Sequence, residues 1–345
     1  NHGIFSSITG WLIAVNVIVF ILNNMVLAHS QRLTTWGVSH EPGATPQQIQ
    51  RAVRDSSQMY ALSNAPGVTY QNLVDPQTGQ VVAHQRYTQR PVLDAWWHFS
   101  TGKFYSEGQV WRVLTFQFLH SGPVHLLFNM MGLFFVGGLV ESYLGSRRFL
   151  AFYLLCGVAG ALLFMLLNLA GYLVSSLVSP QAAAGLPLLL VTDVYTPLIG
   201  ASAGVFGVLL AAAFIAPTSM VAVAFILPMK MKTAVYLFVA LALMNLITNG
   251  ANAGGDAAHI GGAIAGAWLI RRTDVLRDVT TLFGLLGSGG GRTGPASSRR
   301  ASRVDEVDRI LTKVREHGLD SLNTSERASL RRESQRGGGV GGGRG

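Results

Sequence analysis

One serine and one histidine stand out because they lie in otherwise apolar stretches of the sequence. Ser202 is part of "GASAG", where small residues surround its hydroxyl, and His259 is part of "GGDAAHIGG". A serine hydroxyl becomes a nucleophile when a base such as histidine lies within hydrogen-bond distance and takes its proton. The two residue types therefore predict acyl-transfer chemistry, provided that the fold brings them together.

A second pair of polar residues follows the same logic. His125 and Asn129 are four residues apart, so a helix places both side chains on one face. Acyl transfer develops negative charge on a carbonyl oxygen, and side-chain donors and backbone N–H groups at a helix start can stabilise that charge. We therefore expect His125, Asn129 and the backbone N–H of Ser202 to form an oxyanion hole.

Each of these features also has an ordinary structural explanation. Gly200 and Gly204 form a small-xxx-small pattern, and for that stretch alone helix packing is the favoured explanation. A lone His259 in a membrane helix can be a structural hydrogen-bonding group or a proton relay. His125 and Asn129 can simply bridge two helices.

The composition indicates the environment in which this chemistry would occur. Of 345 residues, 49% are hydrophobic and 12% charged, and the mean hydropathy is +0.36, which is typical of a membrane protein. The net charge of +9 need not indicate nucleic acid, because much of the excess flanks apolar segments, where anionic lipid is the expected partner. Cys156 is the single cysteine, so no intramolecular disulfide can form.

The apolar segments predict six transmembrane helices, and hence an all-α polytopic membrane protein. The expected spans are Trp11–Leu27, Val124–Val140, Phe149–Ser175, Leu198–Ala216, Thr233–Thr248 and Ala257–Ile270. The sixth is short and rich in small residues, which is typical of a helix buried among others.

The distribution of basic residues predicts the orientation of these spans. The short connections after the third and fifth spans contain no lysine or arginine. The flanking basic residues all lie on the other side: Arg147, Arg148, Lys230, Lys232, Arg271, Arg272 and Arg277. By the positive-inside rule both termini are cytoplasmic, and the even-numbered spans start at the outer face.

This orientation brings the polar residues to one depth. His125, Asn129, Ser202 and His259 all lie near the starts of even-numbered spans. At a rise of 1.5 Å per residue they fall roughly 5–10 Å below the outer face. A single site accounts for this agreement, whereas separate structural roles require four coincidences. Catalysis is therefore the favoured interpretation of the four residues together.

The rest of the chain divides by composition. Residues 1–277 form the transmembrane core, in which residues 29–90 are a polar, proline-broken extramembrane insertion in the first loop. The aromatic-rich residues 92–121 are expected to lie in the outer membrane interface. Residues 278–303 are predicted to be a Gly/Ser/Arg-rich linker, residues 304–335 a small cytoplasmic helical pair, and residues 336–345 a disordered tail.

These motifs, taken in order, resemble those of the rhomboid intramembrane serine proteases, with a bacterial-type core and a C-terminal extension. The resemblance covers about residues 8–272 apart from the insertion. It is carried by five motifs: "WR" (Trp111, Arg112), "HLLFN" (His125–Asn129), "GGLVESYLG" (with Glu141), "GASAG" around Ser202 and "AHIGG" around His259. One motif alone is weak evidence, but five in this order are specific.

The resemblance implies a six-helix bundle around a water-filled cavity that opens to the outer face. Ser202 would be the nucleophile and His259 the general base, supported by small residues such as Gly200 and Gly262. Trp111 and Arg112 would belong to the interfacial first loop, and Glu141 to a structural hydrogen-bond network. The implied substrates are membrane proteins with a helix-destabilised transmembrane segment, and the implied location is a bacterial inner or cell membrane.

Two residues depart from the family pattern. Many members have glycine where this chain has Ala203, and the extra methyl group is expected to tighten the contact between the fourth and sixth spans. Bacterial relatives often carry a tyrosine where this chain has Phe206, so stacking on His259 is retained without the phenolic hydroxyl. Neither change removes a catalytic group.

Three hypotheses follow from the sequence. The first is a serine endopeptidase without metal or other cofactor, because no HExxH motif and no glycine-rich phosphate loop is present. The second is a non-catalytic rhomboid-like protein that binds transmembrane segments. The third, a small transporter, is weakest because the spans lack the midplane charges that transporters use. The oligomeric state is not predicted.

Overall fold

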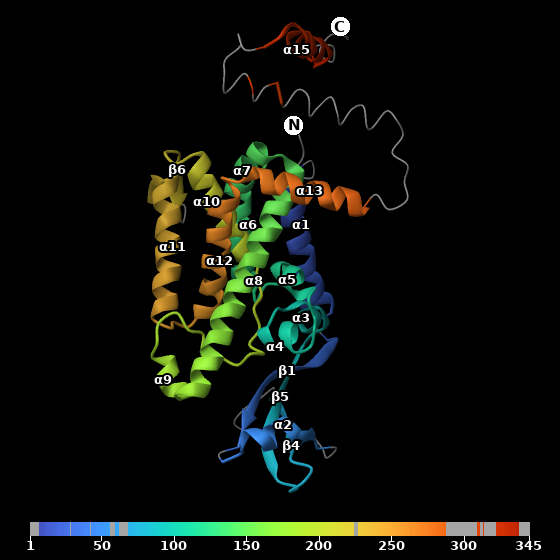
Figure 1. The fold of residues 1–345 in the computed structure, drawn as a ribbon, viewed down its shortest axis with the longest axis vertical. Coiled ribbons are helices and arrows are strands. Elements are labelled where there is room, and N and C mark those ends of the chain that lie inside the picture. Colours follow the sequence, from blue (N-terminus) through green and yellow to red (C-terminus); the bar gives the residue numbers. More distant parts are fainter. Residues whose placement is uncertain are drawn as a thin grey trace. The chain divides into compact units, whose positions relative to one another are not determined.

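The structure, a computed structural model, describes residues 7–27, 29–41, 43–55, 59–61, 68–223, 227–287, 309–310, 313 and 322–337. Figure 1 shows the chain, which divides into two compact units, residues 1–282 and residues 283–345. Each unit is described by itself.

The first unit is built around a bundle of apolar helices. Helix α1 (Ile8–Ile21) continues as a π-helical turn η2 (Leu22–Val26), and α6 (Pro123–Gly132) continues through π-helical η4 (Leu133–Gly137) into α7 (Gly138–Leu144). The other long helices are α8 (Ser146–Leu177), α10 (Ser202–Ile215), α11 (Met231–Ile247) and α12 (Ala253–Leu269). Helix α13 (Thr273–Gly287) starts in this unit and ends beyond residue 282. A short helix α9 (Pro180–Ala184) follows α8.

The lengths of these helices bear on the predicted spans. Three stretches of the described chain are long and apolar enough to cross a membrane, namely Ile8–Val26, Pro123–Leu144 and Ser146–Leu177. Helices α10 and α11 are apolar but shorter. The chain is thus an integral membrane protein with several apolar helices, and the number of six crossings stays a prediction.

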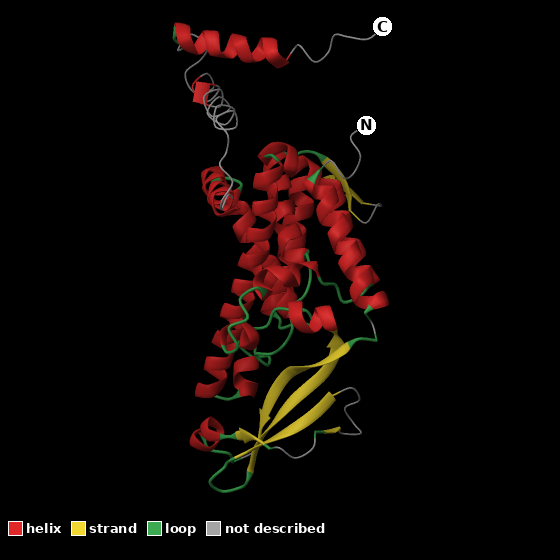
Figure 2. Cartoon of the chain, turned by 90° about the vertical axis from the view of Figure 1, so that its right-hand side faces the viewer, coloured by secondary structure: helices red, strands yellow, loops and turns green. Residues whose placement is uncertain are grey.

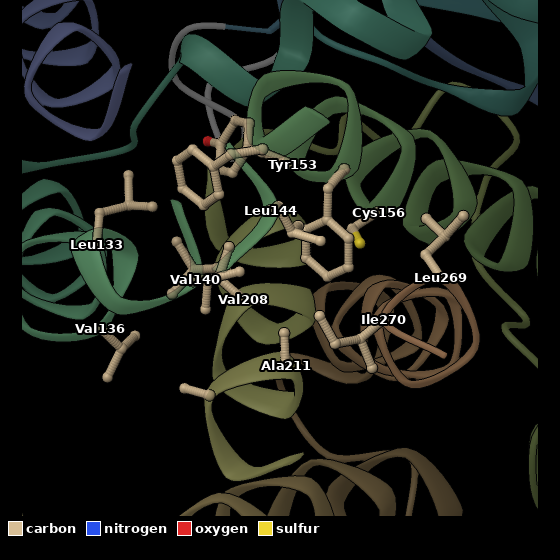
Figure 3. Packing of buried hydrophobic residues seen from close by; sticks show 14 of the residues in the cluster. Leu133, Val136, Val140, Leu144, Tyr153, Cys156, Val208, Ala211, Leu269 and Ile270 are labelled. Atoms are coloured by element: carbon tan, nitrogen blue, oxygen red, sulfur yellow. The ribbon is translucent and has the colours of Figure 1, made fainter. Parts of the chain in front are cut away.

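Helix α10 is the centre of the apolar core, as Figure 3 shows. Its residues Val208 and Ala211 lie between Val136 and Val140 on one side and Ile270 on the other. All five side chains are at most 4% exposed. This close packing fixes α10 between its neighbours and thereby positions its N-terminal residue, Ser202.

The segment before α6 is irregular and is held by one buried arginine. It contains α3 (Val92–Trp97), α4 (Thr101–Tyr105), α5 (Arg112–Thr115) and the 3₁₀ turn η3 (Phe116–Phe118). Arg112 is 2% exposed and donates hydrogen bonds to the carbonyl oxygens of His98 (2.6 Å) and Ala95 (2.8 Å). The guanidinium therefore satisfies loop carbonyls that would otherwise lie buried without a partner.

The insertion in the first loop is a β-sheet, so the prediction of an all-α protein is wrong for this segment. Its strands are β1 (Gln31–His40), β2 (Val53–Arg54), β3 (Tyr60–Ala61), β4 (Val68–Val74) and β5 (Val81–Pro91), with helix α2 (Pro46–Arg51) between β1 and β2. The order is β1-β5-β4-β2, β3 also pairs with β4, and all pairs are antiparallel.

A second departure from the all-α prediction is the hairpin of β6 (Met220–Val223) and β7 (Leu227–Lys230), between α10 and α11. Figure 2 shows this hairpin and the larger sheet as yellow strands at opposite ends of the helical bundle. The two ends of the bundle therefore carry different β structures.

The insertion contacts the loop that leads to Ser202. Asp193, in the connection before α10, accepts hydrogen bonds from Nη2 of Arg86 on β5 (3.0 Å) and from the backbone N–H of Val38 on β1 (3.2 Å). Farther along the same loop, Leu198 forms an isolated β-bridge with Phe99. The approach to α10 is thus fastened to both parts of the first loop.

In the second unit, α15 (Thr324–Gly337) starts with a reciprocal cap. Asn323 Oδ1 accepts from the backbone N–H of Glu326 (2.8 Å), and Glu326 Oε2 accepts from that of Asn323 (2.9 Å). Most of the predicted first helix of the 304–335 pair, the linker residues 288–303 and the tail from residue 338 lie outside the described residues. Residues 278–287, predicted as linker, belong to α13.

Candidate active site

The four polar residues singled out in the sequence line one cavity. It has a volume of about 1020 Å³, and residues of α6, η4, α10, α11 and α12 form its wall. Ser202, His259, His125 and Asn129 all face it, although they are spread over more than a hundred residues of sequence. The structure therefore brings together the residues that sequence reasoning placed at one depth.

Ser202 and His259 are within hydrogen-bond distance of each other. Ser202 is the first residue of α10, and its Oγ lies 2.8 Å from Nε2 of His259 in the second turn of α12. The ring of Phe206, one turn further along α10, stacks on the imidazole with a centroid distance of 4.3 Å and an interplanar angle of 2°. The stack holds the imidazole plane while its Nε2 faces the hydroxyl.

Gly200 shapes the approach to Ser202. Its φ of +135° lies in a region that glycine adopts far more readily than other residues. A Cβ atom at this position would also come within 2.9 Å of Cε1 and Nε2 of His125. This turn ends the extended loop, so α10 begins at Ser202 rather than at the predicted Leu198.

His125 has one nitrogen engaged by Ser121 and the other beside Gly200. The backbone N–H of Ser121 donates to Nδ1 of His125 (3.4 Å), and Oγ of Ser121 lies 3.1 Å from the same nitrogen. A nitrogen that accepts from a backbone N–H carries no proton, so the proton of the neutral ring resides on Nε2. The Nε2–H group lies beside Gly200 and can donate to an oxyanion formed at Ser202.

Two further donors belong to residues that line the same cavity. Asn129 is 5% exposed, and one hydrogen of its amide bonds to the carbonyl oxygen of His125 (2.9 Å), which leaves the second hydrogen for another acceptor. The backbone N–H of Ser202 belongs to the first turn of α10, where N–H groups have no partner inside the helix. His125, Asn129 and Ser202 thus line one cavity, and the oxyanion hole stays a prediction.

Backbone contact brings α10 and α12 together. A Cβ atom on Gly262 of α12 would lie 2.0 Å from the carbonyl oxygen of Ala203 on α10. The methyl group of Ala203 instead faces α8, where a Cβ atom on Gly160 would approach it to 2.6 Å. The methyl group of Ala203 therefore tightens mainly the contact between α10 and α8, rather than the predicted contact between α10 and α12.

Sequence reasoning left out one carboxylate of the site. Asp256 lies one turn before His259, and its Oδ1 is 3.0 Å from Nδ1 of the imidazole. Its Oδ2 accepts a hydrogen bond from Nδ2 of Asn245 on α11. The available signal was the three-residue spacing of Asp256 and His259, which places both on one helical face only if α12 includes Asp256.

The other predicted supporting residues lie elsewhere in the described chain. Trp111 is 43% exposed and donates from Nε1 to the carbonyl oxygen of Trp96 (3.2 Å), and Arg112 holds the first-loop segment. Glu141 accepts hydrogen bonds from the backbone N–H groups of Ile8 (2.8 Å) and Thr9 (2.9 Å), and thus joins α7 to the start of α1. None of these three lines the cavity.

Within the described residues, no cluster of three or more histidine, cysteine, aspartate or glutamate side chains forms a candidate metal site. The residues around the cavity include a hydroxyl, an imidazole and several N–H groups, which are group types that nucleophilic catalysis uses. The absence of a metal or other cofactor stays a prediction.

Fold and site define an integral membrane protein of apolar helices that holds a serine and a histidine in one cavity. The model of the rhomboid domain matches residues 107–273, just under half of the chain, and this range contains all four cavity residues discussed above. The chain belongs to the rhomboid family. A second model, DUF6576, a family of unknown function, matches residues 296–336.

Short matches to curated proteins agree with this family. The chain is 46% identical over 57 residues to the rhomboid protease GluP of Bacillus subtilis (16% of this chain, 11% of GluP). It is 41% identical over 63 residues to RHOMBOID-like protein 1 of Arabidopsis thaliana (18% and 16%). Over 58 residues it is 41% identical to the inactive RHOMBOID-like protein 8 of the same plant (17% and 16%). The chain thus spans less than a fifth of each of these relatives.

Proposed function

We propose that this protein is an intramembrane serine endopeptidase that hydrolyses a peptide bond near the outer end of substrate transmembrane segments. The observation that carries the proposal is the 2.8 Å contact between Ser202 Oγ and His259 Nε2 inside a cavity that also holds oxyanion donors. A serine that only packs against a neighbouring helix requires neither an imidazole within hydrogen-bond distance nor a ring stacked on that imidazole.

In the proposed reaction each of these residues has one step. The Oγ atom of Ser202 attacks the scissile carbonyl carbon while Nε2 of His259 takes the hydroxyl proton. The resulting oxyanion receives hydrogen bonds from His125, Asn129 and the backbone N–H of Ser202. His259 then gives the proton to the leaving amine, and a water molecule, activated by the same imidazole, hydrolyses the acyl–enzyme.

The cavity suggests how a transmembrane substrate reaches Ser202. Apolar side chains line it from two directions, Phe128 and Phe135 from α6 and η4, and Val235 and Phe238 from α11. An apolar substrate segment can therefore enter between these elements. The scissile carbonyl of a helix is hydrogen-bonded within that helix, so the segment must unwind before the carbonyl can reach the oxyanion donors. Substrates with helix-destabilised segments fit this requirement.

Hydrolysis also requires water at a depth where lipid surrounds the protein. A second cavity, of about 410 Å³, lies next to the first and shares four lining residues with it: Pro197, Leu198, Asn252 and Gly255. Its wall includes the polar groups of Thr192, Thr196 and Asn249. In the proposed orientation, with cytoplasmic termini, these loops face the outer side and supply water to the site from there.

The alternative function is a rhomboid-like protein that binds transmembrane segments without cutting them. One matched relative is named inactive, so membership of the family alone does not decide between the two. The complete set of catalytic groups around the cavity favours the protease, because a binding groove needs apolar surface but no activated hydroxyl.

A fluorophosphonate probe tests this proposal directly, because it labels only activated serines. We expect the wild-type protein to be labelled and to cleave a model transmembrane substrate, whereas Ser202→Ala loses both activities. Ser142→Ala is the matched control, since this hydroxyl bonds to the carbonyl oxygen of Gly138 and does not line the cavity. Wild-type protein that stays unlabelled in folded form would exclude the protease and favour the binding protein.

A further inference from the structure

The carboxylate of Asp256 lies on the far side of His259 from the serine. Its Oδ1 is 3.0 Å from Nδ1 of His259, whose Nε2 is 2.8 Å from Oγ of Ser202. Asp256 is 7% exposed, so water has little access to its carboxylate. Hydroxyl, imidazole and carboxylate thus form one continuous chain of hydrogen-bonding groups.

The carboxylate determines which nitrogen of His259 carries the proton. An ionised carboxylate can only accept hydrogen bonds, so Nδ1 must donate to it. The neutral imidazole then has its lone pair on Nε2, which is the form that can take the proton of Ser202. When that proton arrives, the imidazolium lies beside a negative charge that stabilises it.

A second contact keeps the carboxylate in this orientation. The side-chain amide of Asn245 donates to Oδ2 of Asp256, which leaves Oδ1 for His259. Asn245 is on α11, whereas Ser202 is on α10 and the other two residues are on α12. The orientation of the base therefore depends on a third helix, one that also lines the cavity.

Asp256 also has a plausible structural role, because it lies in the first turn of α12. A negative charge there is favoured by the helix dipole. That role alone would not place the carboxylate oxygen against the imidazole, nor would it need an amide from α11. The two contacts are what a residue that orients the base requires.

We propose that Asp256 is a positioning residue that fixes the tautomer and orientation of His259, with Asn245 holding its carboxylate in place. The reaction of this protein thus depends on a Ser202–His259–Asp256 arrangement rather than on the serine–histidine pair alone. This inference rests on the proposed protease function, since it assigns a role within the same reaction.

The test compares Asp256→Asn with the wild-type protein in detergent or liposomes. We expect the rate of fluorophosphonate labelling at Ser202 and the kcat for a model substrate to fall about 10- to 100-fold, that is about 1.4–2.8 kcal/mol in the activation free energy. The KM should stay within about twofold, because Asp256 does not line the cavity that receives substrate. The unfolding temperature should stay close to that of wild type.

A control variant separates positioning from stability. Glu141→Gln makes the same change at another buried carboxylate, one that joins α7 to α1 away from the cavity. It should lower the unfolding temperature while the folded protein is labelled at the wild-type rate. If Asp256→Asn behaved in this way too, the positioning role would be refuted.

A second variant keeps the inference testable if Asp256→Asn does not fold. Asn245→Ala retains the carboxylate but removes its donor from α11, and we expect a smaller loss of kcat, about 2- to 10-fold, at unchanged KM. Wild-type kcat in this variant would contradict the role of Asn245. If wild-type protein is labelled at Ser202 and Asp256→Asn is labelled equally fast, this inference fails while the proposed function stands. Absence of Ser202-dependent labelling in wild type overturns both.

Discussion

The contact between Gly262 and Ala203 gives the sharpest prediction of the structure. A methyl group at Gly262 would lie 2.0 Å from the carbonyl oxygen of Ala203, whereas carbon–oxygen contacts between close helices are about 3.3–3.6 Å. Gly262→Ala therefore requires α10 and α12 to separate by about 1.3 Å at this point. Both contact residues are close to the proposed catalytic pair, because Ala203 follows Ser202 directly and Gly262 is one turn from His259.

This separation is large compared with the tolerance of the hydrogen bond. If it is passed on in full, the 2.8 Å distance between Ser202 Oγ and His259 Nε2 grows to about 4 Å, beyond the usual limit of about 3.2 Å. A misplacement of about 1 Å can lower a rate about 100-fold, and we expect a loss of this order in labelling of Ser202. Overpacking should also reduce the free energy of unfolding by about 1–3 kcal/mol.

The assay measures the rate of fluorophosphonate labelling together with thermal unfolding, so that loss of fold is not mistaken for loss of geometry. Gly138→Ala is the matched control, because a Cβ atom there would have no neighbour within 4 Å and its φ of −61° suits alanine. The control should be labelled at the wild-type rate. Wild-type labelling and unfolding in Gly262→Ala would refute the claim that this contact sets the distance between serine and histidine.

Three further predictions follow from other contacts. Phe206→Leu removes the ring stacked on the imidazole of His259 and should slow labelling about 2- to 10-fold, as expected for an aromatic pair worth about 0.5–1.5 kcal/mol, whereas Phe206→Tyr should not. Arg86→Ala removes the 3.0 Å contact to Asp193 and should increase proteolytic cleavage in the loop before α10; an unchanged digestion pattern would argue against this role. The hydrogen bond from Arg51 lowers the pKa of Asp75 from 3.8 to about 2. Because the folded-state pKa is depressed, the stabilisation is present above about pH 4 and is lost as the pH falls toward 2. The protection of the backbone amides of residues 75–80 against hydrogen exchange, relative to the unfolded chain at the same pH, should therefore fall over that range in wild type. It should change less in Asp75→Asn, and equal profiles would contradict this.

The helical core and its polar residues could be predicted because the membrane imposes strong patterns on a sequence. Long apolar runs are visible directly, and a histidine or serine inside them is conspicuous. The β-sheet of the insertion gives no such signal. On β5 the alternating buried residues are Ala83, Gln85 and Tyr87, so a polar glutamine interrupts the apolar alternation that would reveal a strand.

Asp256 was left out of the predicted site, because a serine–histidine pair does not need it and because it was placed in a connection. The predicted sixth span began at Ala257, because glycines and polar residues before it look like a connection. In the structure α12 begins at Ala253, since that glycine-rich turn packs closely against α8 and the chain can remain helical there. The shift of four residues moves Asp256 from a loop into the helix, and only then does its spacing from His259 have meaning.

The glycines of this bundle have a positioning role as well as a packing role. In a membrane, apolar side chains gain little by leaving lipid for protein, so close backbone contact supplies much of the force between helices. Gly262 meets the backbone of Ala203, and one turn later Gly266 meets that of Gly207. The contacts that join α10 to α12 are therefore the same contacts that set the distance from Ser202 to His259. A packing motif and a reactive serine are usually alternative explanations of a stretch such as "GASAG", but here the proposed reaction requires the packing.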